Sequence, residues 1–285
     1  MKTLRTIREV RETLAPDRRR ERSIGLVPTM GAFHDGHLSL VRRARTECDV
    51  VVVSLFVNPT QFGPAEDLGG YPRDEARDRA LAEAEGVDVL FAPPIEEVYP
   101  EGFDTTVTVG AVTTVLEGDP GQRGPGHFAG VATVVTKLFN MVGPDVAYFG
   151  QKDAQQVLVI RKLVRDLDIP VRIEVCPIVR DPDGLALSSR NAYLSSGERE
   201  RALALSRALR AAEETVAGGA TDAAAVLAAA RAELDAAGIE PEYLELRSMP
   251  DLSEVNRVNG STLLAVAARV GKARLIDNAI LGDNK

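Results

Sequence analysis

The sequence predicts an α/β protein with a doubly wound, Rossmann-like parallel-sheet domain and a smaller C-terminal α+β domain. Short apolar runs that do not alternate with polar residues recur at Ile24–Val27, Val50–Val57, Val87–Phe91, Val146–Phe149 and Val171–Val175. Such runs, rich in β-branched residues, are typical of strands buried on both faces of a parallel sheet. Helical patterns lie between the runs, and this alternation predicts right-handed strand–helix–strand crossovers.

Helical segments follow the first strands. The first covers His37–Glu47 and the second covers Pro72–Glu85. In Val131–Val142 the apolar residues recur at steps of three and four, which places them on one stripe of a helix. Ligands of doubly wound sheets bind at the carboxyl ends of the strands, near the switch in strand order, so we expect the functional residues there.

The composition changes after about Ser195. Residues 197–237 are rich in Ala, Glu and Arg, and a break at Gly218–Asp222 separates two predicted helices. Tyr243–Leu246 and Thr262–Arg269 have the composition of strands. These elements predict the smaller α+β domain.

The domain boundary is predicted between Cys176 and Leu187. This stretch contains Asp181–Gly184 (DPDG), a strong turn signal. We therefore expect domains at 1–178 and 179–285, with a hinge near the DPDG turn that lets the second domain cover a nucleotide bound to the first.

Charge and composition exclude several classes of protein. The 285 residues carry a formal net charge of −8 and are 45% apolar, which is typical of an acidic globular protein with a full core. Nucleic-acid binding needs a basic face, so no nucleic-acid partner is expected. No segment approaches the roughly 20 apolar residues that cross a bilayer, and the N-terminus lacks an apolar signal region. Cys48 and Cys176 are too far apart for a disulfide framework or a CxxC site, so we expect reduced thiols and a cytoplasmic protein without a membrane partner.

A pair of histidines lies where the first predicted strand gives way to a helix. His34 and His37, with Gly36 between them, are two of the three histidines in the chain. Backbone N–H groups at a helix start are unpaired and favour phosphate. Both imidazoles can donate to phosphate oxygens, and Gly31 and Gly36 let the backbone approach a bulky ligand. A helix cap or a chance surface cluster is the alternative, and it fits a lone histidine better than this pair.

A zinc site with His127 as third ligand is a sharper alternative. Metalloprotease histidines are spaced i, i+4 with a catalytic glutamate between them, and neither feature is present here. The sequence also lacks a GxxxxGK(S/T) loop and a GxGxxG motif, so neither P-loop nor dinucleotide binding is supported. No metal ion bound directly by protein side chains is predicted.

Other polar groups follow other predicted strands. Asn58 and Gln61 are neutral amides suited to a hydroxyl-bearing carboxylic acid, although amides capping an Asn-Pro turn explain them about equally well. Lys152 can neutralise phosphate, and Asp153 can cap the following helix. Ser188–Arg190 offers hydroxyls and a guanidinium for phosphates, but an ordinary loop has the same composition.

The glycine-rich run Gly118–His127 is predicted to be too loose for a stable element. Its glycines suit a mobile lid, and a plain surface loop is the alternative. Arg123 and His127 are its candidates for anion binding.

Together these stretches resemble a known family. VPTMGAFHDGHLSLV (Val27–Val41) is similar to the phosphate-binding HxGH signature of the nucleotidyltransferase superfamily, and in detail it resembles the pantothenate synthetase (pantoate–β-alanine ligase) family. The resemblance extends in order and spacing to FVNPTQF, GHFAGVATVVTKLFN, YFGQKDAQQ and LALSSRN, at Phe56–Phe62, Gly126–Asn140, Tyr148–Gln156 and Leu185–Asn191. Leu187, Phe33 and Asp35 replace the more frequent Met, Leu and Glu, and none of these departures removes a group that the chemistry needs.

The resemblance implies two sets of binding residues. Those for ATP are Met30, Gly31, His34, Gly36, His37, Gly150, Lys152, Asp153, Val179, Leu187, Ser188, Ser189 and Arg190. Those for pantoate or β-alanine are Asn58, Gln61, Gln156, Arg123 and His127. His37, His34 and Lys152 are the predicted catalytic residues, with Mg²⁺ held by the ATP phosphates.

The resemblance also implies a homodimer and an AMP-forming carbon–nitrogen ligase. ATP would activate pantoate as pantoyl adenylate, and β-alanine would then displace AMP to give pantothenate. Two alternatives remain at this point. One is a nucleotidyltransferase that joins a nucleotide to a phosphorylated acceptor. The other is a non-catalytic nucleotide-binding protein, which leaves the amides of Asn58, Gln61 and Gln156 unexplained.

Overall fold

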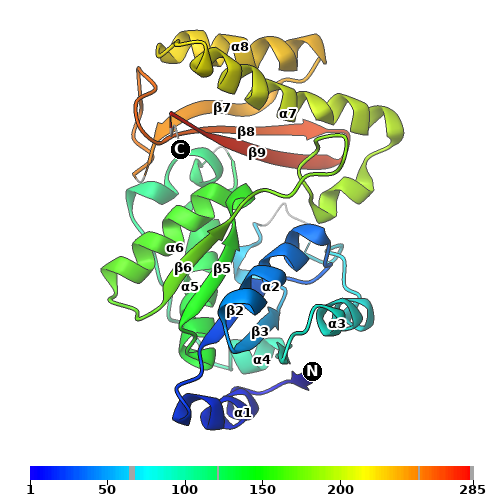
Figure 1. Ribbon diagram of the computed structural model, residues 1–285, viewed down its shortest axis with the longest axis vertical. Helices are drawn as coiled ribbons and strands as arrows, with labels where there is room; N and C mark the ends of the chain where they lie inside the picture. The colour runs from blue at the N-terminus through cyan, green and yellow to red at the C-terminus, as the bar shows by residue number, and fades with distance from the viewer. Residues whose placement is uncertain (64–67, 121, 250, 283–285) are drawn as a thin grey trace. The chain divides into compact units, whose positions relative to one another are not determined.

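The apolar runs form one parallel sheet of six strands, in the order β1-β4-β3-β2-β5-β6 (Figure 1). The computed structural model describes residues 1–63, 68–120, 122–249 and 251–282. The strands of this sheet are β1 (Lys2–Leu4), β2 (Ile24–Thr29), β3 (Val50–Leu55), β4 (Val89–Phe91), β5 (Val146–Gly150) and β6 (Arg172–Cys176). All five strands predicted for this sheet are confirmed, and β1 is an addition that pairs with β4 at the edge of the sheet.

The connecting helices complete a doubly wound fold. They are α1 (Ile7–Arg19), α2 (Asp35–Glu47), α3 (Glu75–Ala84), α4 (Ile95–Val98), α5 (Pro125–Val142) and α6 (Ala154–Asp166). Short 3₁₀ helices lie between them, namely η1 (Pro59–Gln61), η2 (Ala111–Thr113), η3 (Leu116–Gly118) and η4 (Gln151–Asp153). The chain runs outward from β2 through β3 to β4, and then returns to β5 on the other side of β2. The strand order therefore switches between β2 and β5. A ligand is expected to bind at the carboxyl ends of these two strands.

Helices on both faces explain why the strands do not alternate. Leu26 and Val52 face one core with residues of α1, α5 and α6. Their neighbours Val27 and Val53 face a second core with residues of α2 and α3. Because successive side chains of a strand point to opposite faces, both must be apolar when both faces are covered.

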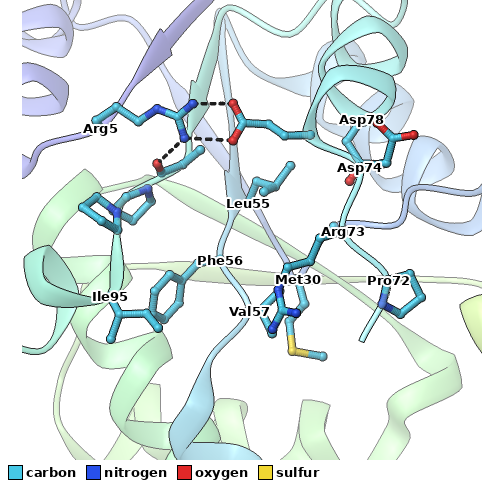
Figure 2. Close-up of a pocket in the computed structure, with 15 residues that line it drawn as sticks. Arg5, Met30, Leu55, Phe56, Val57, Pro72, Arg73, Asp74, Asp78 and Ile95 are labelled. Atoms are coloured by element: carbon cyan, nitrogen blue, oxygen red, sulfur yellow. Dashed lines mark hydrogen bonds and ion pairs between the residues drawn. The ribbon is translucent and has the colours of Figure 1, made fainter. Parts of the chain in front are cut away.

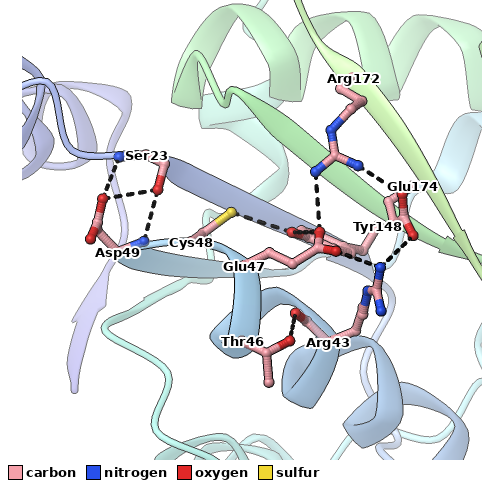
Figure 3. Close-up of polar contacts among 9 residues, drawn as sticks. All are labelled: Ser23, Arg43, Thr46, Glu47, Cys48, Asp49, Tyr148, Arg172 and Glu174. Atoms are coloured by element: carbon pink, nitrogen blue, oxygen red, sulfur yellow. Dashed lines mark hydrogen bonds and ion pairs between the residues drawn. The ribbon is translucent and has the colours of Figure 1, made fainter.

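A polar cluster ties the carboxyl end of α2 to β5 and β6 (Figure 3). The Tyr148 hydroxyl donates to Glu47 at 2.9 Å and lies 3.3 Å from the Cys48 Sγ. Arg172 also donates to Glu47, at 3.1 Å. The hydrogen bond from Tyr148 and that from Arg172 lower the pKa of the Glu47 carboxyl, while burial raises the pKa of the Tyr148 phenol. The opposite end of the same helix carries the histidine pair.

The chain divides into two units, and the smaller one is built on an antiparallel sheet. The larger unit comprises residues 1–151 and 155–177, and the smaller comprises 152–154 and 178–285. The smaller sheet has the order β7-β8-β9, with β7 (Pro241–Ser248), β8 (Thr262–Val270) and β9 (Ala273–Leu281). Helices α7 (Ser196–Ala217) and α8 (Ala223–Ala236) pack together and cover one of its faces (Figure 1). The segment 152–154, which the sequence assigns to the first domain, belongs to the smaller unit.

Neither cysteine is paired with another. Cys48 and Cys176 are buried free thiols. Burial raises the pKa of Cys176 to about 11, so this thiol is protonated at neutral pH. None of the helices in the part of the chain that the structure describes combines the length and apolarity needed to cross a membrane.

Candidate active site

The histidine pair lies at the carboxyl end of β2, beside the switch in strand order. His34 is the N-cap of α2, and its Nδ1 accepts a hydrogen bond from the Gly36 N–H at 3.1 Å. A neutral imidazole whose Nδ1 accepts must carry its proton on Nε2, so the cap fixes the tautomer. Capping and ligand binding are therefore compatible roles, because the cap leaves Nε2 as a donor.

The two imidazoles lie close to each other at the start of α2. Their ring centroids are 4.2 Å apart, with an angle of 37° between the planes. The buried Phe33 ring lies 5.7 Å from that of His37. The first-turn N–H groups of a helix and two imidazoles thus share one end of α2. This combination of donors suits a phosphate chain.

A buried carboxylate that the sequence did not single out holds the preceding loop. Asp78 of α3 is 1% exposed, and its two oxygens accept from the backbone N–H groups of Ala32 and Phe33 at 2.8 and 2.7 Å. Ala32 has φ +54°, in the left-handed region that non-glycine residues rarely adopt. A Cβ on Gly31, whose φ is +86°, would lie 2.9 Å from the Asp78 carboxylate. Glycine at 31 therefore serves a close approach to Asp78.

Replacing Asp78 with asparagine is expected to loosen this loop. The amide would turn an NH₂ group toward one of the two backbone N–H donors, so at least one buried hydrogen bond to a charged group would be lost. The free energy of unfolding should fall by about 1.5–3 kcal/mol. The KM for ATP should rise because the loop leads into His34. Denaturant titration and initial rates measure the two effects.

Asp74→Asn is the matched control, because it makes the same change in the same helix. Asp74 caps α3 by accepting the Arg77 N–H at 3.0 Å, and asparagine caps a helix about equally well. Equal losses of stability in the two variants would contradict the role given to Asp78.

A cavity of about 230 Å³ is lined by Met30 and Gly31 of this loop and by Asp78 (Figure 2). Its wall is mostly apolar and includes Met30, Leu55, Phe56 and Ile95. Arg5 and Glu75 also line it and form a two-pronged ion pair, including one hydrogen bond of 2.9 Å. The cavity therefore adjoins the backbone that precedes the histidine pair.

The second group of predicted residues lies after β3, on η1. The Asn58 side chain caps η1 by accepting the Thr60 N–H at 3.4 Å, and its Nδ2 donates to Gln61 Oε1 at 3.0 Å. Gln61 in turn directs its Nε2 at Met30 Sδ, 3.3 Å away. The structure thus brings together Met30, Asn58 and Gln61. Asn58 is almost fully buried, at 1% exposure, and it is the Gln61 amide that contacts Met30.

The prediction of a loose run at Gly118–His127 is confirmed in part: residues 119–120 and 122–124 belong to no helix or strand, and Gly121 lies outside the described residues. The end of the run is helical. Gly124, with φ +78°, and Pro125 begin α5, so His127 lies in the first helical turn and is buried. Its Nε2 lies 3.1 Å from Arg123 Nη1, and its Nδ1 lies 2.8 Å from the Gln61 carbonyl oxygen. A guanidinium can only donate, so Nε2 accepts and the Nδ1–H donates to Gln61. His127 and Arg123 therefore hold the wall that carries Gln61.

Gln155, a neighbour of the predicted Gln156, fastens the segment that leads to this wall. Its buried amide donates to the carbonyls of Val112 and Val115 at 2.9 and 2.7 Å and accepts from the Glu117 N–H at 3.0 Å. Gln156 is half-buried on α6. Gly150 ends β5, and a Cβ there would meet no described atom within 4 Å.

The remaining ATP candidates belong to the smaller unit. The Lys152 carbonyl accepts from Asn278 Nδ2 of β9 at 2.9 Å, and Asp153 is exposed at the end of η4. Lys152 and Ser188 line one cavity of about 10 Å³, just large enough for one water molecule. The structure thus brings Lys152 and Ser188 together within this unit.

The segment around the predicted hinge forms a hairpin inside the smaller unit. The Leu187 N–H donates to the Val179 carbonyl at 3.0 Å, which pairs two predicted ATP-binding residues. Arg199 of α7 donates to Asp181 and Asp183 at 2.7 and 2.8 Å. The turn is therefore tied to its own unit, and the chain passes from the larger unit to the smaller one between residues 177 and 178. A hinge near Asp181–Gly184 stays a prediction.

Ser188 caps the short helix that carries the other phosphate candidates. Its Oγ accepts a hydrogen bond from the Arg190 N–H at 3.3 Å, and the helix that follows is η5 (Ser189–Tyr193). Ser189 and Arg190 are half-buried there. Among the described residues, no three His, Cys, Asp or Glu side chains lie close enough together to hold a metal ion.

Comparison with known proteins gives one consistent result. The family model described as Pantoate-beta-alanine ligase matches residues 2–280. A pantothenate synthetase of Roseiflexus castenholzii is 55% identical over 282 residues, covering 99% of both chains. The crystal structure of pantothenate synthetase from Thermus thermophilus is 49% identical, with a TM-score of 0.92 and coverage of 98% of this chain and 99% of that one. A pantoate-beta-alanine ligase from Francisella tularensis, complexed with beta-gamma ATP and beta-alanine, is 36% identical, with a TM-score of 0.80 and coverage of 98% and 97%.

Proposed function

Because the chain belongs to the pantoate–β-alanine ligase family, we propose that it condenses pantoate with β-alanine to form pantothenate, converting ATP to AMP and pyrophosphate. The observation that carries the assignment of the site is the histidine pair at the first turn of α2, beside the switch in strand order. The ligand bound to the Francisella tularensis relative supports ATP as the cosubstrate.

In the first step, a pantoate carboxylate oxygen forms a bond to the α-phosphorus of ATP, and the bond from that phosphorus to the bridging oxygen breaks. Pyrophosphate leaves with the bond electrons, and pantoyl adenylate remains. A carboxylic acid with a pKa of about 4 is already ionised at neutral pH, so this step needs no general base. It needs in-line positioning and donors for the charge on the phosphate oxygens. His37 is the proposed catalytic donor, with His34 Nε2–H beside it.

The other ATP contacts divide between phosphate, ribose and adenine. Lys152 and the Ser188–Arg190 segment are proposed to bind phosphates, as a point charge and as hydroxyl and guanidinium donors. Gly150 and Asp153 are assigned to the ribose. The backbone of Val179 is assigned to adenine, and Leu187 is proposed as a further ATP contact. Met30, Gly31 and Gly36 supply the backbone that the nucleotide approaches.

Pantoate is assigned to the wall formed by Gln61, with Gln156 as its second amide. Asn58, Arg123 and His127 support this assignment indirectly, because each of them contacts Gln61 or a residue that does. A direct contact of Arg123 and His127 with a substrate anion stays a prediction.

In the second step, the β-alanine amine attacks the acyl carbon, the bond from that carbon to the AMP oxygen breaks, and AMP leaves. An ordinary alkyl amine has a pKa near 10, so the attacking amine must lose a proton. A site that excludes water protects the adenylate from hydrolysis in the meantime. We propose that the smaller unit covers the nucleotide, and compaction on adding ATP and pantoate, measured by small-angle scattering, tests this.

Mg²⁺ fits this site only as a partner of the nucleotide. The proposed phosphate-binding side chains are imidazoles, a lysine, hydroxyls and an arginine, whereas Mg²⁺ prefers oxygen ligands in an octahedral arrangement. ATP phosphates would therefore hold the ion, and bound Mg²⁺ would neutralise phosphate charge. A homodimer and a cytoplasmic location complete the proposal.

Product analysis separates this function from its alternatives. The chain is incubated with ATP, pantoate and β-alanine, and the nucleotides are separated by chromatography. We expect AMP and pyrophosphate in equal amounts, formed only when pantoate is present. A product that retains the nucleotide on a phosphorylated acceptor would indicate a nucleotidyltransferase. ATP binding without pyrophosphate release would indicate a non-catalytic protein.

A further inference from the structure

We propose that Tyr99 is a positioning residue that acts through Asn58 to fix the Gln61 amide with its NH₂ group toward the substrate. The position beside Gln61 would then take only a substrate atom that accepts a hydrogen bond, such as a carboxylate or hydroxyl oxygen of pantoate. The inference rests on the proposed function and names the polarity of one contact in its site.

Tyr99 is one of three donors directed at a single oxygen. Its hydroxyl donates to Asn58 Oδ1 at 2.7 Å, and the Thr60 hydroxyl and backbone N–H donate to the same oxygen at 3.0 and 3.4 Å. The centroids of the Phe56 and Phe103 rings lie 6.1 and 5.1 Å from that of the Tyr99 ring. Burial raises the pKa of the Tyr99 phenol, so the group keeps the proton that it donates.

Two backbone groups set which end of the Asn58 amide faces Gln61, and the Tyr99 hydroxyl holds the amide in that place. Asn58 Nδ2 donates to the Gly130 carbonyl at 3.2 Å and to Gln61 Oε1 at 3.0 Å. A flipped amide would place its oxygen against the Gly130 carbonyl oxygen and its NH₂ group against the Thr60 N–H. A carbonyl oxygen can only accept and a backbone N–H can only donate. The flip would therefore place two acceptors together at Gly130 and two donors together at Thr60. Asn58 therefore always offers Nδ2 to Gln61.

This orientation determines what Gln61 can do. Its Oε1 is occupied as the acceptor of Asn58 Nδ2, so Nε2 with its two N–H groups takes the other side. Within the described part of the chain, the Met30 thioether at 3.3 Å is the acceptor for this group. A thioether is a weak acceptor, and an amide with 8% residue exposure gains from a stronger one. A pantoate oxygen provides it, whereas a donor group of a wrong substrate would face N–H.

A double-mutant cycle tests whether Tyr99 acts through Gln61. Tyr99→Phe should raise the KM for pantoate about tenfold, the effect of one hydrogen bond, while the KM for ATP stays within about twofold. Gln61→Met removes the amide at similar length. In that background Tyr99→Phe should change the KM for pantoate by less than about twofold, because the group it orients is gone. Multiplicative effects in the double variant, or no effect of Tyr99→Phe alone, would overturn the proposal.

Two further variants keep the test decisive. Tyr148→Phe removes the hydroxyl of a second tyrosine, the one bonded to Glu47, and should lower the melting temperature without raising the KM for pantoate. If Tyr99→Phe fails to fold, Asn58→Asp replaces it. An acceptor in place of Nδ2 should turn Gln61 around and raise the KM for pantoate by on the order of 100-fold. A pantoate KM within about twofold of wild type in folded Asn58→Asp would overturn the proposal.

The failure of this inference differs from failure of the proposed function. A wild-type chain that releases no AMP with all three substrates would overturn the proposed function and, with it, pantoate as the ligand beside Gln61. An active wild type with independent Tyr99 and Gln61 effects would overturn only the role of Tyr99.

Discussion

Replacing His37 with alanine is expected to slow pyrophosphate release by on the order of 10²–10³-fold, the usual effect of losing one donor to a charged transition state. The imidazole lies in the first turn of α2, 4.2 Å from the His34 ring, where the helix N–H groups also favour negative charge. The loss should appear in kcat, because the donor stabilises charge that develops during the reaction. A coupled assay for pyrophosphate, with saturating ATP and pantoate, measures it.

Two other variants make the His37 result specific. His37→Gln keeps an N–H donor at roughly the distance of the imidazole and should recover part of the rate. Arg42→Ala removes a positive charge from the same helix, where the guanidinium is bound by Glu85, and should stay close to wild type. Equal rates for wild type and a folded His37→Ala would refute the role assigned to His37.

Replacing Gly130 with alanine is expected to destabilise the fold and to displace the wall that carries Gln61. A Cβ at this position would lie 2.3 Å from the Thr60 carbonyl oxygen and 2.6 Å from the Gln61 backbone nitrogen. Both atoms are backbone, so α5 and η1 must move apart. Overpacking of this kind costs about 1–3 kcal/mol or more of the free energy of unfolding. A shift of about 1 Å at Gln61 can lower kcat/KM for pantoate by on the order of 10²-fold.

Gly126→Ala is the matched control in the same helix. A Cβ at Gly126 meets no described atom within 4 Å, and alanine is the better helix former. Its free energy of unfolding and its kcat/KM for pantoate should be close to wild type. Similar losses in both variants would show that α5 tolerates no added methyl group, and the contact with η1 would not be the cause.

The sheet could be predicted because strands that are buried on both faces have runs of consecutive apolar residues. Each apolar run of the larger unit became a strand, and Leu26 and Val27 show why adjacent residues are both apolar. Helix α1 left a weaker mark, since Val10 and Leu14 are its fully buried residues and Pro16 lies inside it. Strand β9 was missed because Asp277 and Asn278 interrupt its apolar pattern. Both are buried, and their partners are Arg180 and the Lys152 carbonyl.

Some residues of the site could be predicted from their place in the sequence, and others could not because their partners are distant in sequence. His34, His37 and Gln61 follow strands directly, so position along the chain indicated them. Asp78 and Tyr99 act on residues that lie 45 and 41 positions away, and no local pattern marks such a partner. The helical turn around His127 was missed for a similar reason, because its contact with the Gln61 carbonyl joins residues 66 positions apart. A mobile lid before it stays a prediction.

A crystal structure with pantoate and a non-hydrolysable ATP analogue tests the central claim most directly. The account predicts the α-phosphate at the first turn of α2, within hydrogen-bond distance of His34 or His37, and a pantoate oxygen bonded to Gln61 Nε2. A phosphate chain bound elsewhere, with the start of α2 facing only solvent, would contradict it.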